Sequence, residues 1–443
     1  MKRAIETELL AWQTNPHRTP LIIRGARQVG KSYSAESFGQ KYFKNLVTLN
    51  FEFQPQLKSV FETLDPIQII QKLTLLLNVD IRPGETLLFL DEIQECPEAL
   101  KSLRYFKEKM PDLHVLAAGS LLEFTLSETD FSFPVGRVSF LWMRPLSFLE
   151  YLSALHGDCL SEHLATVDFA TKHDAALHQK LLTDFRLYLQ IGGLPMAVQT
   201  YSDTQDITAC RRVQAALLQS YQRDFGKYAT KTQIQPLKTV FMKTPGLVGQ
   251  QIKYSNLDKD SRSRELKIAI HQLYLAGLIH PIYATSASGL PLSTHQKENQ
   301  FKLLFIDIGL MQTENPISIL NGTTQRLNAG SHTEQVVGQE LKAYAADYQD
   351  ENLFYWKREE SNSHAEVDYL TVVEGMIIPI EVKATSGGQL KSLRYFLKEK
   401  NAPLGIRISE HPLSFHEKIL SVPFYMIRDI PRLVKLALDF SQF

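Results

Sequence analysis

Cysteine is scarce in this chain of 443 residues. The three cysteines, Cys96, Cys159 and Cys210, are far apart, and none of them belongs to a C-x-x-C pair. This spacing argues against a disulfide framework and against a structural zinc site, because both need paired or clustered cysteines. The 13 histidines are scattered and form no H-E-x-x-H helix. A zinc site of the metalloprotease type is therefore excluded as well.

Excess charge of either sign is also lacking. Lys plus Arg and Asp plus Glu both number 48, so the formal net charge is zero. The overall charge therefore gives no reason to expect a nucleic-acid partner, and only a local basic face would supply one.

Long apolar runs are absent too. No stretch approaches the roughly 20 apolar residues that a membrane-spanning helix needs. Residues 1–8 are charged where a signal peptide requires an apolar segment. We therefore expect a cytoplasmic protein with no membrane contact. With 44% hydrophobic and 22% charged residues the composition is that of a globular protein, and roughly 150 residues per domain predicts about three domains.

Short apolar runs alternate with helical patterns over residues 1–155. This alternation is typical of an α/β fold in which helices cover both faces of a parallel sheet. We predict a helix at 99–109 and strands at 21–23, 46–51, 86–90 and 114–118.

The rest of the chain is predicted to hold three further regions. Residues 156–232 read as a helical, lid-like region, with helices at 177–189 and 213–225. Residues 233–314 contain short helices, a longer helix at 266–278 and a strand pair, which indicates either a winged helix or a helical linker with a surface hairpin. Residues 315–443, of which 315–330 read as a linker, are predicted to form a separate α/β domain. In the region 233–314 the expected strands are 279–283 and 302–306. In the last region a helix at 333–348 is expected to precede strands at 353–356, 367–373 and 376–382, and a final αβ section follows.

A phosphate-binding motif follows the first predicted strand and opens a helix. It fits the pattern G-x-x-x-x-G-K-[ST] without a gap, and the flanking strand and helix are the context that supports such a match. The glycines allow a tight turn whose N–H groups face phosphate oxygens, the lysine reaches the β and γ phosphates, and the serine ligates Mg²⁺. Tyr33 is counted with the site. The motif is Gly25-Ala26-Arg27-Gln28-Val29-Gly30-Lys31-Ser32.

An acidic pair ends the apolar strand at 86–90. Asp91 is predicted to hold Mg²⁺ together with Ser32. Glu92 is predicted to accept a proton from the water that attacks the γ phosphate. ATP and Mg²⁺ are therefore the expected ligands of this region.

Two further residues are candidates for the same site. Ser120 follows the strand at 114–118 and can sense the γ phosphate, although a simple strand-end turn explains it equally well. Arg137 can act as an arginine finger, within one chain or across a subunit boundary, and such a finger contributes ~10³-fold or more in rate. A solvated arginine in a turn is the alternative.

A second group of acidic residues lies near the C-terminus. Asp368 occupies one predicted strand, and Glu381 closes the next, with Lys383 two residues further on the same face. Two carboxylates at this point can bind Mg²⁺ and activate a water, and a lysine can stabilise the developing negative charge. Glu340, on the preceding helix, is a further candidate metal ligand. A solvent-exposed β-hairpin is the simpler explanation of the same pattern.

These motifs resemble a family of bacterial and archaeal AAA+ ATPases in which the ATPase is fused to a C-terminal domain of unknown function. The resemblance covers nearly the whole chain and implies an ASCE-type ATPase core, a helical and winged-helix middle and a restriction-endonuclease-like C-terminal fold. Thr333-Glu334-Gln335 departs from the family, which more often has Glu-Asn there. The segments that carry the resemblance, besides the phosphate-binding motif, are Asn50-Phe51-Glu52, Leu90-Asp91-Glu92-Ile93-Gln94, Ala118-Gly119-Ser120, Gly136-Arg137-Val138, Arg144-Pro145-Leu146-Ser147-Phe148-Leu149-Glu150, Gly192-Gly193-Leu194-Pro195, Arg223-Asp224 and Phe305-Ile306-Asp307-Ile308-Gly309-Leu310.

The C-terminal pattern also resembles the PD-(D/E)XK nuclease superfamily, with Asp368, Glu381 and Lys383 at its signature positions. Three hypotheses follow. The first is an Mg²⁺-dependent ATPase that controls a DNA-directed, nuclease-like domain. The second is a nucleotide-dependent switch whose C-terminal domain binds DNA or a protein without cutting. The third is a homo-oligomeric scaffold in which ATP drives ring formation. Because a fold can persist after its chemistry is lost, the resemblance alone does not choose among them.

Overall fold

The chain folds into two compact units built around different sheets, as the computed structural model shows. The first unit comprises residues 1–144, 275–277 and 346–350, and the second comprises residues 145–274, 278–345 and 351–443. The structure describes residues 1–126, 136–169, 174–259, 261–314, 329–346, 348, 352–358, 365–385 and 389–440.

The first unit contains a five-stranded parallel sheet with the strand order β2-β3-β4-β1-β5. Four of its strands lie where the apolar runs predicted them, so the α/β class with a parallel sheet is confirmed. The three central strands are almost entirely buried, which explains why their sequences are continuously apolar instead of alternating. The strands are β1 (Leu21–Arg24), β2 (Asn45–Asn50), β3 (Thr86–Asp91), β4 (His114–Ala118) and β5 (Ser139–Trp142).

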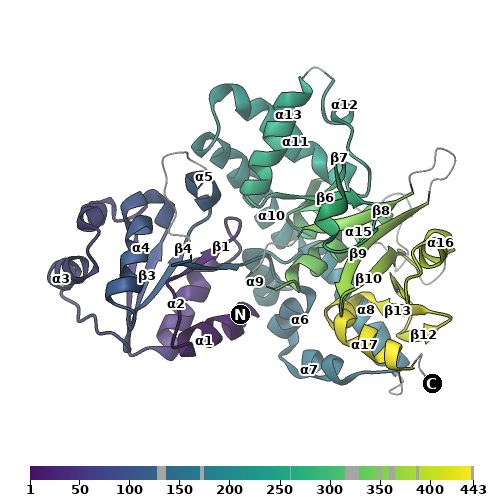
Figure 1. Cartoon of the computed structure of the whole chain (residues 1–443), viewed down its shortest axis with the longest axis horizontal. Coiled ribbons are helices and arrows are strands. Elements are labelled where there is room, and N and C mark those ends of the chain that lie inside the picture. The colour runs from purple at the N-terminus through teal and green to yellow at the C-terminus, as the bar shows by residue number, and fades with distance from the viewer. Residues whose placement is uncertain are drawn as a thin grey trace. The chain divides into compact units, whose positions relative to one another are not determined.

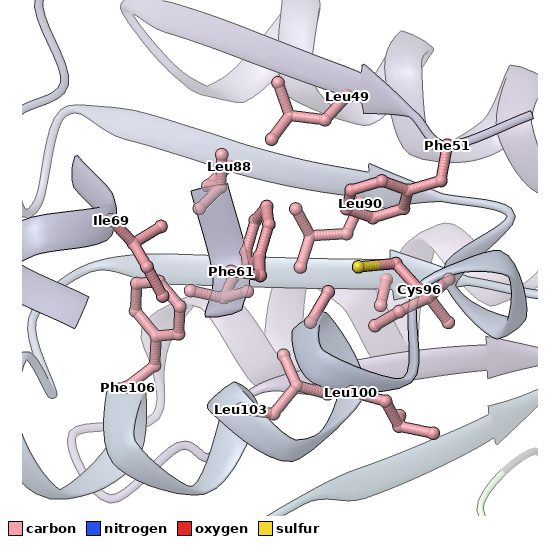
Figure 2. Close-up of a cluster of buried hydrophobic side chains, with 14 of the residues drawn as sticks. Leu49, Phe51, Phe61, Ile69, Leu88, Leu90, Cys96, Leu100, Leu103 and Phe106 are labelled. Atoms are coloured by element: carbon pink, nitrogen blue, oxygen red, sulfur yellow. The ribbon is translucent and has the colours of Figure 1, made fainter. Parts of the chain in front are cut away.

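Helices cover both faces of this sheet (Figure 1). On one face, Leu88 and Leu90 of β3 meet Leu103 and Phe106 of α4, as Figure 2 shows. On the other face α2 approaches so closely that a Cβ at Gly39 would lie 2.6 Å from the Leu46 side chain. The helices of this unit are α1 (Ile5–Thr14), α2 (Lys31–Tyr42), η1 (Pro55–Thr63), α3 (Pro66–Leu77), η2 (Ile93–Glu95), α4 (Pro97–Lys109) and α5 (Leu122–Leu126).

The strand order places three segments that contain predicted site residues at one edge of the sheet. Because β1, β3 and β4 are parallel, the segments that follow them emerge at the same, carboxyl, edge of the sheet. β4 lies between β1 and β3, so the segment after β4 lies between the other two. This edge is where open α/β sheets bind their ligands.

The second unit contains an eight-stranded mixed sheet with the order β12-β13-β11-β10-β9-β8-β6-β7. The hairpin β6–β7 was predicted to belong to a separate middle region, but β6 pairs in parallel with β8. One sheet therefore runs from the predicted middle region into the C-terminal strands. Its strands are β6 (Ile279–Thr285), β7 (Gln296–Phe305), β8 (Leu353–Lys357), β9 (Glu366–Val373), β10 (Met376–Val382), β11 (Gly405–Ser409), β12 (Ser414–His416) and β13 (Ile419–Pro423).

Helices form most of the second unit before this sheet. Three of them begin earlier than predicted: α8 begins at Ala175, α10 begins at Ile207 and α13 begins at Ser263. The Asp206 carboxylate caps α10, because it accepts a hydrogen bond from Thr208 N. α13 also ends early, at Leu275, because Gly277 adopts a left-handed conformation with φ +71°. The helices are α6 (Phe148–His156), α7 (Cys159–Thr166), α8 (Ala175–Ile191), α9 (Pro195–Thr204), α10 (Ile207–Asp224), η3 (Phe225–Lys227), α11 (Lys231–Leu247), α12 (Tyr254–Leu257), α13 (Ser263–Leu275), η4 (Leu292–His295), α14 (Ile308–Glu314), α15 (Ala329–Ala343), α16 (Lys391–Glu399), η5 (Phe424–Asp429) and α17 (Ile430–Phe440).

Helices followed by a hairpin are found in the middle region as expected, but the first helix is not short: α11 has 17 residues and α13 has 13. The winged helix itself stays a prediction. The division into four regions and the restriction-endonuclease-like fold also stay predictions. Of the predicted linker, residues 315–328 lie outside the described residues. Within the described ranges, no helix has both the length and the apolar character that crossing a membrane requires.

Candidate functional site

The loop from Gly25 to Ser32 joins β1 to α2 at the carboxyl edge of the five-stranded sheet. Its glycines are required by the backbone. Gly25 has φ +136°, and a Cβ there would lie 2.1 Å from the carbonyl oxygen of Met143. Gly30 has φ +97° and immediately precedes the first residue of α2. The loop therefore delivers the N-terminus of a 12-residue helix to the sheet edge, an arrangement that favours an anion.

Lys31 lies beneath this loop. Its Nζ donates hydrogen bonds to the carbonyl oxygens of Gly25, at 2.9 Å, and Ala26, at 2.7 Å. Burial lowers the pKa of Lys31 to about 8, against the opposing effect of Glu92 and Asp91. The hydrogen-bond partners of Lys31 are thus neutral carbonyl groups, and its positive charge is available to a phosphate.

Ser32 and Asp91 converge although 59 residues separate them. Ser32 Oγ donates to Asp91 Oδ1 at 2.9 Å, and Asn50 Nδ2, at the end of the neighbouring β2, donates to Asp91 Oδ2 at 2.9 Å. Burial raises the pKa of Asp91 above its ordinary value. A serine hydroxyl beside a carboxylate is a donor set that suits Mg²⁺, so these residues fit the predicted ion. Asn50 was not assigned a role from the sequence.

Glu92 is held by a chain of polar side chains at the same edge. It follows β3 in a left-handed conformation, with φ 50°. Gln94 Nε2 donates to Glu92 Oε2 at 2.6 Å, and Ser120 Oγ lies 3.4 Å from the same oxygen. Arg27 Nε in turn donates to Ser120 Oγ at 3.0 Å. The structure therefore brings Glu92, Ser120 and Arg27 together, and it adds Gln94, which the sequence reasoning had quoted without assigning it a role.

The side chains of four other predicted site residues form no hydrogen bond with the groups described above. Ala26 and Val29 are buried, and Gln28 adopts a left-handed conformation with φ 66°. Tyr33 is 60% exposed, and its hydroxyl accepts a hydrogen bond from the N-terminal amino group. The Tyr33 ring therefore points to the surface in this structure.

Arg137 lies away from the phosphate-binding loop. It precedes the amino end of β5, whose Ser139 pairs with Leu21 at the amino end of β1. Its Nε lies 3.5 Å from Glu108 Oε1 near the end of α4. The phosphate-binding loop follows the opposite, carboxyl end of β1. Since Arg137 and the loop occupy opposite edges of one sheet, the within-chain finger is disfavoured, and two predictions remain: a finger that acts across a subunit boundary, and a solvated arginine in a turn.

The C-terminal residues Asp368, Glu381 and Lys383 do come together in the second unit. β9 and β10 are antiparallel neighbours, so the strand that carries Asp368 lies against the strand that carries Glu381. Lys383 Nζ contacts Glu381 Oε1 at 2.7 Å, and Asp368 Oδ2 accepts a hydrogen bond from Val382 N at 2.7 Å. Burial, reinforced by Asp368, raises the pKa of Glu381 to about 7.

Glu340 does not join them. Its two carboxylate oxygens accept hydrogen bonds from the backbone N–H of Phe148, at 3.0 Å each, and one also accepts from the Tyr188 hydroxyl at 3.0 Å. Both oxygens of the Glu340 carboxylate thus accept hydrogen bonds at the start of α6. The acidic residue that α15 does bring to Asp368 is Glu334, and the negative charge of Asp368 helps to raise its pKa.

A buried lysine occupies the centre of this carboxylate cluster, which we define as Glu334, Glu366, Asp368 and Glu381. Lys302 of β7 is only 2% exposed, and its Nζ lies 2.6 Å from Glu366 Oε1 and 3.5 Å from Glu334 Oε2. Burial alone would lower the pKa of Lys302, but Glu334, Glu366 and Asp368 together raise it above its ordinary value. The ammonium group therefore stays charged, and together with Lys383 it supplies positive charge to the cluster.

The carboxylate cluster does not fit a divalent metal ion. Lys302 forms ion pairs with Glu366 and Glu334, and Lys383 forms one with Glu381. Over the described ranges, no group of three or more His, Cys, Asp or Glu side chains is arranged to hold a metal. A metal would have to enter beside a buried ammonium group, which repels it. Glu340 therefore does not share a site with Asp368 and Glu381, and the ion pairs of Lys302 and Lys383 disfavour the metal-binding role predicted for these residues, which stays a prediction.

Comparisons with known families and proteins agree with the nucleotide site. Residues 17–152 match a family model described as an AAA domain. Residues 182–318 and 329–425 match two domains of unknown function, DUF8612 and DUF4143. No curated protein matches the chain significantly. The AAA match supports an AAA+ ATPase, with binding and hydrolysis of ATP in the first unit.

Solved structures of AAA+ proteins resemble parts of the chain only distantly. One is PCH-2 from Caenorhabditis elegans, with 12% identity, 46% of this chain and 64% of that chain covered, and a TM-score of 0.28. Another is the RuvB Holliday junction branch migration motor from Thermotoga maritima, with 13% identity, coverages of 62% and 87%, and a TM-score of 0.30. A third is AMPPCP-bound DnaA from Aquifex aeolicus, with 10% identity, coverages of 61% and 86%, and a TM-score of 0.29. The alignment thus spans less than two thirds of PCH-2.

Proposed function

We propose that the chain is an Mg²⁺-dependent ATPase that uses its nucleotide state as a switch, without cleaving nucleic acid in its C-terminal region. The observation that carries the first part is the convergence of two motifs at one point. Ser32 Oγ, at the start of α2, lies 2.9 Å from Asp91 Oδ1, at the end of β3. A phosphate-binding loop and an acidic strand meet in this way where a nucleotide triphosphate is held.

Each residue of the site has a separate task in this proposal. The backbone N–H groups of the loop and the Lys31 ammonium bind the phosphates. Ser32 and Asp91 would hold Mg²⁺, which would neutralise negative charge on the phosphate oxygens. The Glu92 carboxylate accepts a proton from the attacking water. Gln94 and Ser120 orient Glu92 through the hydrogen bonds described above.

Two substitutions separate binding from hydrolysis. Lys31→Ala should abolish ATP binding, because it removes the cation beneath the loop. Glu92→Gln keeps the shape of the side chain but removes the base, so it should bind ATP like the wild type and hydrolyse it about 100-fold more slowly, or worse. Equilibrium binding of a fluorescent ATP analogue and phosphate release measure the two steps.

Lys41→Ala is the matched control, because Lys41 is an exposed lysine of the same helix that pairs with Glu6. It should leave both steps unchanged. Wild-type turnover in Lys31→Ala or Glu92→Gln would show that the nucleotide site has been assigned to the wrong residues.

The second part of the proposal selects the non-cleaving alternative for the C-terminal region. Lys302 supports it, because the position that a metal would take among Glu334, Glu366 and Asp368 is filled by an ammonium group. The predicted nuclease would instead cut DNA in a metal-dependent way. Plasmid and single-stranded DNA are incubated with Mg²⁺ or Mn²⁺, with and without ATP, beside an Asp368→Ala control. We expect no cleavage; cleavage that Asp368→Ala abolishes would establish the nuclease.

A further inference from the structure

A short part of the chain departs sharply from its overall neutrality. Between residues 225 and 267 there are nine Lys and Arg residues but only three Asp and Glu residues, whereas the whole chain has 48 of each kind. These residues belong to the second unit and lead from η3 through α11 and α12 into α13. Local charge of this size attracts a partner of opposite sign even when the net charge is zero.

The fold gathers this charge on neighbouring helices, which lie close together in Figure 1. Gln272 of α13 donates a hydrogen bond to Gln233 of α11 at 3.5 Å, so these two helices are in contact. All nine basic side chains of the segment are exposed, and six of them lie between the end of α11 and the first half of α13, where none forms an ion pair with an acidic residue in the described part of the chain. These six are Lys243, Lys253, Lys259, Arg262, Arg264 and Lys267. We call these six residues, which lie on α11, on α13 and in the segments that flank α12, the basic helical surface.

A concavity on this surface combines cations with neutral hydrogen-bond donors. It is open, with a volume of about 450 Å³, and it lies between the end of α11 and α12. The lining also contains the carboxylate of Asp258, whose Oδ2 accepts a hydrogen bond from Ser261 Oγ at 2.6 Å. Its lining residues are Lys243, Leu247, Ser255, Asn256, Asp258 and Lys259. Lysine, serine and asparagine side chains are the groups that contact phosphate in nucleic-acid complexes.

α13 extends the same charge beyond the concavity. Arg264, Lys267 and His271 are exposed and recur at helical spacing, so they share one side of the helix. With 13 residues the helix is roughly 20 Å long. Its width and length suit the major groove of B-form DNA, which admits an α-helix.

We propose that the basic helical surface binds the phosphate backbone of double-stranded DNA. A single phosphate ion would neutralise only the concavity, whereas six cations spread over three segments match a polyanion. RNA duplexes are a poorer match because their major groove is too narrow for a helix. An anionic membrane is also a poorer match, because the large apolar side chains exposed by α11 and α13, Met242 and Ile268, are isolated on separate helices. The proposal does not depend on ATP hydrolysis.

The test is a salt-dependent binding measurement on the full chain without nucleotide. Fluorescence anisotropy of a labelled duplex of about 30 base pairs is followed between roughly 50 and 200 mM salt. The test variant combines four neutralising changes, Lys243→Gln, Lys259→Gln, Arg264→Gln and Lys267→Gln. Its affinity should fall at least 100-fold near 0.1 M salt, and the slope of log affinity against log salt should decrease by about 3 to 4, since each lost phosphate contact removes nearly one.

The matched control neutralises three exposed cations on α16 and α17, Lys391→Gln, Lys398→Gln and Lys435→Gln. The control should bind DNA within about twofold of the wild type, and circular dichroism should show that both variants are folded. If the four changes prevent folding, the pair Lys243→Gln and Lys259→Gln alone should still weaken binding at least tenfold.

Three outcomes would overturn the proposal. The first is that the wild type does not bind duplex DNA at low salt. The second is that the α16–α17 control loses as much affinity as the test variant. The third is that RNA duplexes or phosphatidylserine vesicles bind more tightly than the DNA duplex and lose that binding in the test variant.

Discussion

Two buried lysines mark the two acidic sites of this molecule, and their partners differ. Lys31 in the first unit donates to the carbonyl oxygens of Gly25 and Ala26. Lys302 in the second unit lies against the carboxylates of Glu366 and Glu334. A lysine held by neutral carbonyls keeps its charge for a ligand, whereas a lysine held by carboxylates already has its counter-ion.

The comparison shows that an acidic motif can be interpreted only when the positions of the neighbouring cations are known. Both sites have carboxylates of raised pKa at the ends of buried strands. In the first unit Asp91 is hydrogen-bonded by neutral groups, Ser32 and Asn50. In the second, each acidic residue near Asp368 faces an ammonium group. We therefore expect the first site to bind ligands and the second to stabilise the fold.

Removing the internal cation should have the largest effect. Lys302→Ala leaves the half-buried carboxylates of Glu334, Glu366 and Asp368 without the Lys302 cation, so the free energy of unfolding should fall by roughly 3 to 5 kcal/mol. Urea denaturation measures it. Lys435→Ala, which breaks an exposed pair with Glu374, is the control and should change stability far less. Equal losses of unfolding free energy in the two variants would mean that Lys302 does not stabilise the carboxylate cluster.

The burial of Glu340 should make the stability of the protein depend on pH. Burial raises its pKa to about 7 from an ordinary value of 4.5, so the folded state holds the proton more tightly than the unfolded state. Its contribution to stability is therefore largest below about pH 4.5 and is lost as the pH rises through 7. Glu340→Gln should remove this dependence. The free energy of unfolding of the variant, relative to that of the wild type, should therefore increase by roughly 3 kcal/mol as the pH rises from 4 to 8.

Urea denaturation at several pH values measures this change. Glu374→Gln, at an exposed glutamate, should keep the wild-type pH profile. A Glu340→Gln variant whose unfolding free energy follows the wild-type curve would contradict the assignment of Glu340 as a buried cap of α6.

Within the nucleotide site, Gln94 should act on hydrolysis alone. Gln94→Ala removes the 2.6 Å hydrogen bond to Glu92 but leaves the contact from Ser120. We expect kcat to fall about tenfold, or ~1.4 kcal/mol, while the Kd for ATP stays unchanged. Phosphate release and nucleotide binding are measured side by side. Gln68→Ala, at an exposed position on α3, should alter neither. A weaker Kd with an unchanged kcat would place Gln94 in binding instead.

The smallest expected effect is that of metal alone. Without nucleotide, millimolar Mn²⁺ should leave the Tm of the wild type unchanged, because Lys302 fills the carboxylate cluster. In Lys302→Ala the same ion should raise the Tm, since the acidic residues are then free to bind it. Differential scanning fluorimetry makes both measurements. A rise in the wild type that Asp368→Ala abolishes would show that the cluster holds metal after all.

The sequence by itself determined the nucleotide site, because that site is local. The glycines, Lys31 and Ser32 lie within eight residues, and buried parallel strands of continuous apolar residues fix where Asp91 and Ser120 emerge. The strand positions and the α/β class were predictable for the same reason. The local basic segment at 225–267 was equally readable, but the neutral net charge concealed it.

Only the tertiary structure decided the second site. Glu334 and Glu340 lie six residues apart on α15, which at 3.6 residues per turn puts them on different faces of the helix. Packing then turned Glu334 to the carboxylate cluster and Glu340 to the start of α6. Lys302 reaches Glu366 because β6–β7 joins the C-terminal strands through the pairing of β6 with β8. No local pattern encodes that pairing, since it connects segments about 70 residues apart whose alignment depends on the whole sheet.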